Sequence, residues 1–225
     1  MIRMDFRLEH KTVSLSDQIF EKLENDILVG EYPKGEVLTE LKLSEQLGVS
    51  RTPIREALRR LEQENIITMT SKGALVVGIS PEDIEAIYEI RVRIEGYAAR
   101  CAALRASDEE IKELLDIVDL QGFYIQKEDP QQIMHCDSKF HQMLYKMSGR
   151  LSIYTTLSEL HKKIIKFRRS SVEMSERARL SYAEHRAIYD AIAAHDAELA
   201  DKLTVAHVEK ARENINKKIA AMQAK

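Results

Sequence analysis

One aspartate and three histidines in the second half of the chain are residue types that bind metal ions. Asp137 and His141 stand four residues apart, so on a helix they share one face. His185 and His207 each lie at the centre of a later helical pattern, beside apolar residues, whereas His161 is not expected to join them. Four such side chains in one bundle can bind a divalent cation, because imidazole suits zinc, nickel and other late first-row metals. From spacing alone, core histidines with ordinary hydrogen-bond partners and a surface Asp/His pair remain alternatives.

An arginine interrupts an apolar stripe further upstream. On a helix expected over 81–105, Arg91 and Glu95 lie on the inward face, four residues apart. A buried guanidinium has to be paired, because burying it alone is too costly. Two interpretations stay open. Arg91 pairs with Glu95 or with a neighbouring helix, or it lines a cavity and binds the carboxylate of a ligand.

A third group of residues, within 48–67, has the features of a DNA-reading helix. Gly48 ends one helical pattern, Ser50 is a good N-cap for the next, and Pro53 fits its first turn. A short helix, a tight turn and a second helix with arginine and threonine at its start are typical of a helix-turn-helix in the DNA major groove. The candidate DNA contacts, including two in a later turn, are Ser50, Arg51, Thr52, Arg55, Lys72 and Gly73.

The elements around this segment predict a winged helix-turn-helix domain over residues 1–79. We expect helices over 14–29, from Thr39 onward, and over 48–64. Two β-prone runs follow, 66–70 and 74–79, and the turn between them predicts a hairpin. Lys72 and Gly73 would lie at the tip of this wing, close to phosphates or the minor groove.

The remainder, residues 80–225, is expected to be entirely helical. Ser80-Pro81-Glu82-Asp83 marks its start, and no convincing strand follows. The expected helices cover 81–105, 108–127, 130–148, 150–171, 176–195 and 197–222. Six helices with short loops predict an antiparallel bundle with its own core. The fold class is therefore mostly α, with one winged domain and one helical effector-binding and dimerisation domain.

Composition limits the class of protein. No apolar run approaches 18 residues, and the first residues lack the apolar core of a secretory signal, so we expect a cytoplasmic protein without a membrane partner. Cys101 and Cys136 share no close-spaced motif and are expected to be buried free thiols. The net charge of −3 argues against nonspecific coating of nucleic acid, but residues 51–60 hold four arginines and one glutamate. Such a local basic site suits docking on phosphates.

Several stretches resemble the GntR family of bacterial transcription regulators. In the first half these stretches are Gly30–Gly35, Leu38–Glu40 and Leu47–Leu61. The second half resembles the all-helical FCD effector domain of the FadR subfamily, through Ile87–Arg91 with Glu95, Asp137–His141, Glu184–Ile188, and Asp196–Glu198 leading to His207. The resemblance covers residues 12–222, and six rather than seven C-terminal helices place it nearer the VanR-like branch.

The resemblance implies a bound metal ion and an organic ligand. The residues that match the family's metal ligands, at the floor of an effector cavity, are Asp137, His141, His185 and His207. Zinc is the first expectation, with nickel or manganese as alternatives. The arginine that matches Arg91 meets the carboxylate of the effector. The sequence departs from the family at Leu41, where many members carry arginine, and at Arg150, where asparagine usually follows the glycine.

The expected function is regulation of transcription by a homodimer that binds a near-palindromic operator in double-stranded DNA. On family grounds it is a repressor, and a small organic acid at the metal controls its operator affinity. One alternative is a metal-dependent enzyme, in which open positions on the Asp/His₃ centre activate water or dioxygen. Another is a metal-ion sensor, in which the ion itself is the signal.

Overall fold

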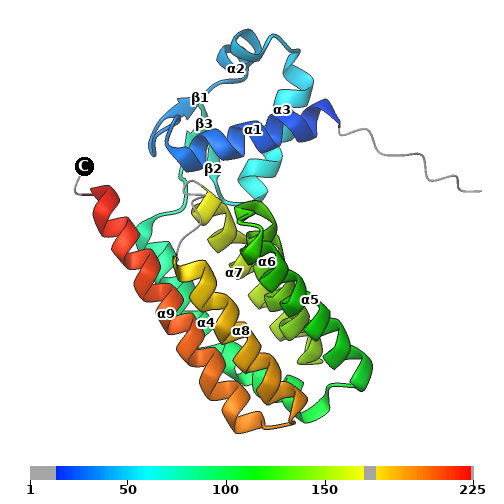
Figure 1. Cartoon of the computed structure of the whole chain (residues 1–225). Helices are drawn as coiled ribbons and strands as arrows, with labels where there is room; N and C mark the ends of the chain where they lie inside the picture. The colour runs from blue at the N-terminus through cyan, green and yellow to red at the C-terminus, as the bar shows by residue number, and fades with distance from the viewer. Residues whose placement is uncertain (1–13, 170–175, 224–225) are drawn as a thin grey trace, which may run out of the picture. The chain divides into compact units, whose positions relative to one another are not determined.

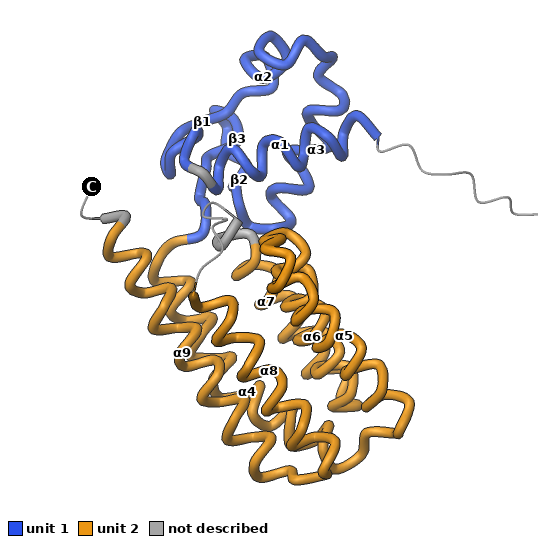
Figure 2. Tube along the Cα trace, in the orientation of Figure 1, with its two compact units in different colours: residues 1–79 blue, residues 80–225 orange. Residues whose placement is uncertain are grey.

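The computed structural model describes residues 14–169 and 176–223. The chain divides into two compact units, which meet between Ile79 and Ser80 (Figure 2). Each unit has a hydrophobic core of its own. The fold is mostly α, with a small sheet in the first unit, which confirms the expected fold class.

Three helices form most of the first unit, and their ends follow the capping residues in the sequence. They are α1 (Leu15–Val29), α2 (Glu40–Leu47) and α3 (Arg51–Gln63). Ser14 and Asp17 form a capping box at the start of α1, and the Thr39 hydroxyl accepts a hydrogen bond from the backbone of α2. Gly48 ends α2 in the left-handed conformation, which glycine adopts without steric cost. These caps fix the turn that separates α2 from α3.

A three-stranded antiparallel sheet completes the first unit. Its strands are β1 (Val37–Leu38), β2 (Ile67–Thr70) and β3 (Gly73–Val76), in the order β1-β3-β2. The β2–β3 hairpin was expected, and Thr70 pairs with Gly73 across its turn. β1 was not expected, because two residues are too few to show an alternating pattern. It pairs Val37 with Leu75 and covers the outer edge of β3.

The backbone of β1 leaves no room for a side chain at Gly73. Replacement of Gly73 by alanine should therefore destabilise the first unit. Its φ is +133°, and an added Cβ would lie 2.5 Å from the carbonyl oxygen of Leu38 in β1. We expect Gly73→Ala to cost about 1–3 kcal/mol, visible as faster amide hydrogen exchange across β1–β3 in the full chain. Ser71→Ala in the adjacent turn is the control. Equal protection in Gly73→Ala and the parent would contradict this account.

Within the described residues, six helices form the second unit, as expected from the sequence. They are α4 (Pro81–Arg105), α5 (Asp108–Gln126), α6 (Pro130–Met147), α7 (Leu151–Arg169), α8 (Glu176–Ala193) and α9 (Ala197–Gln223). Ser80 and Ser107 begin α4 and α5 with capping boxes, and Asp129 caps α6. Residues 170 and 171, the expected end of the fourth helix of this unit, lie outside the described residues.

The helices of the second unit lie side by side in a bundle with α4 in close contact with α6, α7, α8 and α9 (Figure 1). The largest buried side chains of this core include Tyr88, Phe140 and Tyr145. Cys101 and Cys136 are buried free thiols, as expected. No helix in the described ranges is long and apolar enough to cross a membrane.

Candidate metal centre and nucleic-acid interface

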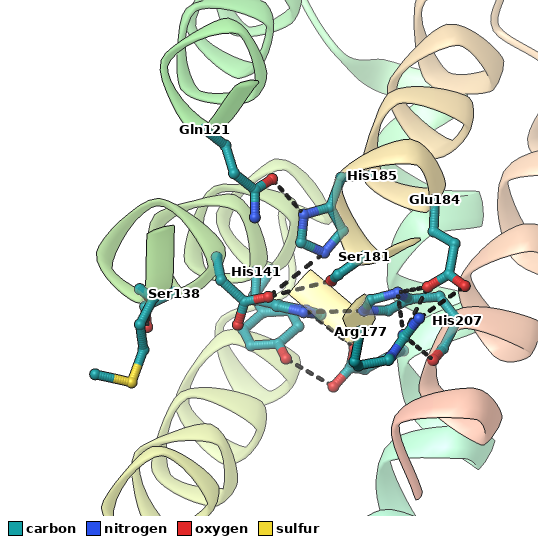
Figure 3. Close-up of polar contacts among 12 residues, drawn as sticks. Gln121, Ser138, His141, Arg177, Ser181, Glu184, His185 and His207 are labelled. Atoms are coloured by element: carbon teal, nitrogen blue, oxygen red, sulfur yellow. Dashed lines mark hydrogen bonds and ion pairs between the residues drawn. The ribbon is translucent and has the colours of Figure 1, made fainter. Parts of the chain in front are cut away.

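Three histidines from three different helices meet inside the bundle. His141 on α6, His185 on α8 and His207 on α9 are at most 3% exposed, and one ring nitrogen of each lies within 4.8 Å of the others (Figure 3). The Nε2 atoms of His141 and His207 face each other at 3.3 Å. The structure thus brings together three of the four residues proposed as ligands, although they are up to 66 residues apart in the sequence.

Each of these histidines has an acceptor beside its other ring nitrogen. His207 Nδ1 lies 2.7 Å from Glu184 Oε2, and His185 Nδ1 lies 2.9 Å from Gln121 Oε1. His141 Nδ1 lies 3.3 Å from Glu95 Oε2, a close approach that lacks the geometry of a hydrogen bond. A hydrogen on Nδ1 that points at an oxygen leaves the Nε2 lone pair free, which is how metal-binding histidines are oriented in proteins.

The Nε2 atoms of His141 and His207, 3.3 Å apart, lie within hydrogen-bond distance when one of them carries the hydrogen. When both hydrogens are on Nδ1, the facing Nε2 lone pairs repel unless a cation lies near both. The separation fits a tetrahedral zinc ion, because two nitrogens about 2.1 Å from the ion would be about 3.4 Å apart. Burial, together with neighbouring charges, holds the pKa of His185 well below its usual value and also lowers the pKa of His207. Both imidazoles are therefore neutral at pH 7, the form that binds a metal.

Asp137, the fourth expected ligand, is buried beside the histidines. Its Oδ1 lies 3.9 Å from Nε2 of His185, and the hydroxyl of Ser181 donates to the same oxygen at 3.4 Å. Asp137 and His141 share one face of α6, as their spacing predicted. A carboxylate at this edge supplies one negative charge beside the three imidazoles.

Glu184 is fixed between His207 and two cations. Arg177 donates to both of its carboxylate oxygens, at 2.9 and 2.6 Å (Figure 3). Lys210 Nζ lies 3.2 Å from Glu184 Oε1. Burial would raise the pKa of Glu184, but hydrogen bonds from His207 and Arg177 lower it to about 2. The carboxylate is therefore ionised, which stabilises the Nδ1–H form of His207.

Arg91 is 2% exposed and pairs with Glu95, four residues further along α4. The hydroxyl of Tyr145 donates to Glu95 Oε1 at 2.7 Å. Burial would raise the pKa of Glu95, but Arg91 and His141 hold it well below its usual value. The paired interpretation of Arg91 is confirmed. Glu95 also connects the arginine to the histidine cluster, because its second oxygen faces His141.

His161, which we did not expect near this cluster, lies next to it. Its ring centroid is 4.7 Å from that of His141, and the side chain is 1% exposed. The expectation was wrong because α7 buries the face that carries Leu157, His161 and Ile164. The spacing of four and three residues in this set is the signal that could have identified it.

In the first unit, α3 turns one side toward the core and the other toward solvent. Its buried side is made of Ile54, Ala57, Leu58 and Leu61. Three of the proposed DNA contacts, Arg51, Thr52 and Arg55, are exposed in its first two turns. Ser50 occupies the N-cap, and its hydroxyl makes no capping hydrogen bond. Lys72 is exposed in the hairpin turn, whereas Gly73 is the first residue of β3.

The arginines of α3 differ in their partners. Arg55 donates to both oxygens of Glu40 on α2, from Nε at 2.8 Å and Nη2 at 2.7 Å. Arg60 instead pairs with Asp17 and lies over the ring of Phe20, so it fixes α1 against α3. Leu41, where many relatives carry arginine, is 51% exposed on α2.

Comparison with known proteins identifies a matching family model for each of the two units. Residues 15–77 match the model of the bacterial regulatory proteins of the GntR family, and residues 86–210 match the FCD domain. The chain is 31% identical to the Nta operon transcriptional regulator of Aminobacter aminovorans over 182 residues, 78% of this chain and 82% of that protein. It is 28% identical to the transcriptional repressor NanR of Enterobacter sp. strain 638, over 86% and 82% of the two chains.

Among solved structures, E. coli McbR/YncC has the same fold. It superposes with a TM-score of 0.66 at 22% identity, covering 95% of this chain and all of that one. The family models together match most of the described residues, one in each unit. The chain therefore belongs to the GntR family of bacterial regulatory proteins, with an FCD domain as its second unit.

Proposed function

We propose that this protein is a transcription regulator whose DNA affinity is controlled by a small organic acid bound at a metal ion in the FCD domain. The observation that carries the metal is the orientation of the three histidines. Nδ1 of His185 and of His207 each has a hydrogen-bond partner on another residue, Nδ1 of His141 lies 3.3 Å from Glu95, and the Nε2 atoms of His141 and His207 face each other. Three imidazoles with Asp137 at the edge are a donor set that suits zinc, with nickel or manganese as alternatives.

A metal bound here would supply positive charge that attracts the carboxylate of an organic acid. Arg91 is the proposed second anchor, because it pairs with Glu95, and the other oxygen of Glu95 lies 3.3 Å from His141 in the cluster. Its guanidinium carries five N–H donors, and only part of this set is engaged by Glu95. A ligand that binds one arrangement of the helices better than another shifts their populations and so changes DNA affinity.

For the first unit, we propose that each α3 enters the major groove of one half-site in a near-palindromic operator bound by a homodimer. Arg51 and Arg55 would read guanines, Ser50 and Thr52 would contact bases or phosphates nearby, and Lys72 with Gly73 would approach the backbone at the wing. Repression is favoured because NanR, a relative over most of the chain, is a repressor. The six-helix second unit favours the VanR-like branch. A protein acting on bacterial DNA would work in the cytoplasm.

Two alternatives use the same histidine cluster. An enzyme would need a group that moves protons near the metal, and Glu184 is held ionised by Arg177 and Lys210. Family membership also disfavours it, because GntR proteins are DNA-binding regulators. A metal-ion sensor is more similar to the proposed regulator, since it needs only that the ion itself change DNA affinity.

One experiment separates these functions. Duplexes bound by the full-length protein are selected from a random library, and affinity for the best duplex is then measured against zinc and against hydroxy and sugar acids. We expect zinc to bind first and an acid to change the affinity only afterwards. A response to zinc alone would establish the metal sensor, and no response to any acid would contradict the proposed control.

Glu40 is expected to increase the sequence specificity of DNA binding, because it fixes the orientation of the Arg55 side chain. Because Glu40 engages Nε and Nη2, the remaining edge of the guanidinium stays oriented for a base. We expect Glu40→Gln to lower the ratio of specific to nonspecific affinity severalfold, since Arg55 regains rotamer freedom. Glu56→Gln on α3 makes the same charge change without touching this pair. Equal ratios in the two variants would mean that charge alone matters.

A further inference from the structure

We propose that Ser158 and His161 on α7 form a subsite that binds the hydroxyl groups of the organic acid, beside the histidine cluster. This inference rests on the proposed function, because the acid's carboxylate would be held by the metal and Arg91. It adds a residue pair that distinguishes hydroxylated acids from acids that lack hydroxyls.

The first observation is the polar edge of His161. The side chain is 1% exposed, and neither Nδ1 nor Nε2 has a hydrogen-bond partner within the described ranges. Its ring lies against His141, with centroids 4.7 Å apart, and its centroid is 6.2 Å from that of Tyr145. A buried imidazole carries one donor and one acceptor when neutral, and leaving both unused is unfavourable. Such a side chain next to a ligand site is suited to binding a polar group of the ligand.

The second observation is independent and concerns Ser158, three residues before His161 on the same face of α7. Its hydroxyl is also buried without a hydrogen-bond partner in the described part of the chain. Helical hydroxyls normally donate to the carbonyl one turn earlier. Ser138 and Thr155 do this here, at 2.9 Å in both cases. Ser158 differs from them, so its hydroxyl is free to bind something other than its own helix.

The chemistry of these two side chains selects the class of group they bind. A carboxylate offers only acceptors and an alkyl tail offers neither donor nor acceptor. A carboxylate can accept from the N–H of His161 and from the hydroxyl of Ser158, but it cannot donate to the acceptor nitrogen of His161. Hydroxyls both donate and accept, so two of them can satisfy both nitrogens of His161 and the oxygen of Ser158. Since the two side chains are one helical turn apart, a ligand with hydroxyls on neighbouring carbons can reach both.

The test compares acids that differ only in hydroxyl groups. Calorimetry on the full-length protein measures three pairs, lactate with propionate, malate with succinate, and gluconate with hexanoate, each with and without added zinc. We expect at least one hydroxy acid to bind about tenfold or more tightly than its partner. Ser158→Ala and His161→Phe should each reduce this preference severalfold while zinc content stays unchanged.

Matched variants and the rescue make the result specific. Ser152→Ala on α7 and His135→Phe on α6 make the same changes at exposed positions and should keep the preference. His161→Gln restores a donor and an acceptor and should recover part of it. The subsite is wrong if no hydroxy acid is preferred, or if both variants keep the preference. A chain that binds no zinc but shows the preference would contradict the proposed metal and leave the subsite standing.

Discussion

His207→Ala should leave the protein without a bound metal ion. The substitution removes one of the two Nε2 atoms that face each other at 3.3 Å, and with it a direct metal ligand. Changes to groups that only orient such ligands typically cost about 10–100-fold in metal affinity, so we expect the loss here to be larger. Glu184→Gln keeps all three histidines and changes the acceptor at His207 Nδ1 together with the ion pairs to Arg177 and Lys210, so it should give the smaller loss.

Metal content after dialysis against a weak chelator measures the effect directly. The parent chain is expected to keep a stoichiometric ion, and His207→Ala to lose it. A ligand present at a thousandfold excess over its dissociation constant adds about 4 kcal/mol to stability. Chelation should therefore lower the melting temperature of the parent but not of the variant. His135→Ala, at an exposed position on α6, is the control. Retention of the ion by His207→Ala would rule out this metal centre.

Replacing Arg51 and Arg55 together by alanine should abolish selective DNA binding. Each arginine that makes two hydrogen bonds to a guanine contributes about 5- to 150-fold to discrimination between the correct and a wrong base. Both side chains are exposed at the start of α3, and the apolar face of the helix lies on the opposite side. Because neither arginine belongs to the core, the double variant should fold normally and lose roughly 30-fold to 10⁴-fold in affinity for its selected duplex.

Fluorescence anisotropy at several salt concentrations tests this loss against other basic residues. Lys72→Ala at the wing should weaken all duplexes alike and reduce the salt slope by about 1, as expected for a phosphate contact. Arg186→Ala, which removes an exposed arginine paired with Asp119 in the second unit, should leave binding unchanged. Unaltered sequence preference in the double variant would place base reading elsewhere on the protein.

The sequence predicted those parts of the fold that depend on local signals. Ser14, Thr39, Ser80 and Ser107 begin helices where they were expected, because a capping side chain acts within three residues. The hairpin turn before Gly73 was also predicted, because turn residues act on the backbone directly beside them. Helical spacing then placed Asp137 and His141 on one face of α6.

Features that depend on contacts between distant segments were not predictable in the same way. Pairing of β1 with β3 joins residues about 38 positions apart, and nothing local in Val37 and Leu38 indicates it. The acceptors beside the histidines, Gln121 and Glu95, lie on other helices from the histidines that they face. Only the packed bundle shows which oxygen meets which ring nitrogen.

α4 has a mechanical consequence that concerns neither base reading nor ligand chemistry. The helix starts at Pro81, directly after the boundary between the two units, and it also carries Arg91 and Glu95. Pro81 and Glu95 lie 14 positions apart on unbroken helix, which corresponds to a rigid rod of about 21 Å. A tilt of this rod about Glu95 by only about 5° would displace its first residue by nearly 2 Å. A small tilt of α4 about Glu95, beside His141, would therefore displace the covalent link at Ile79 by more than it displaces Glu95.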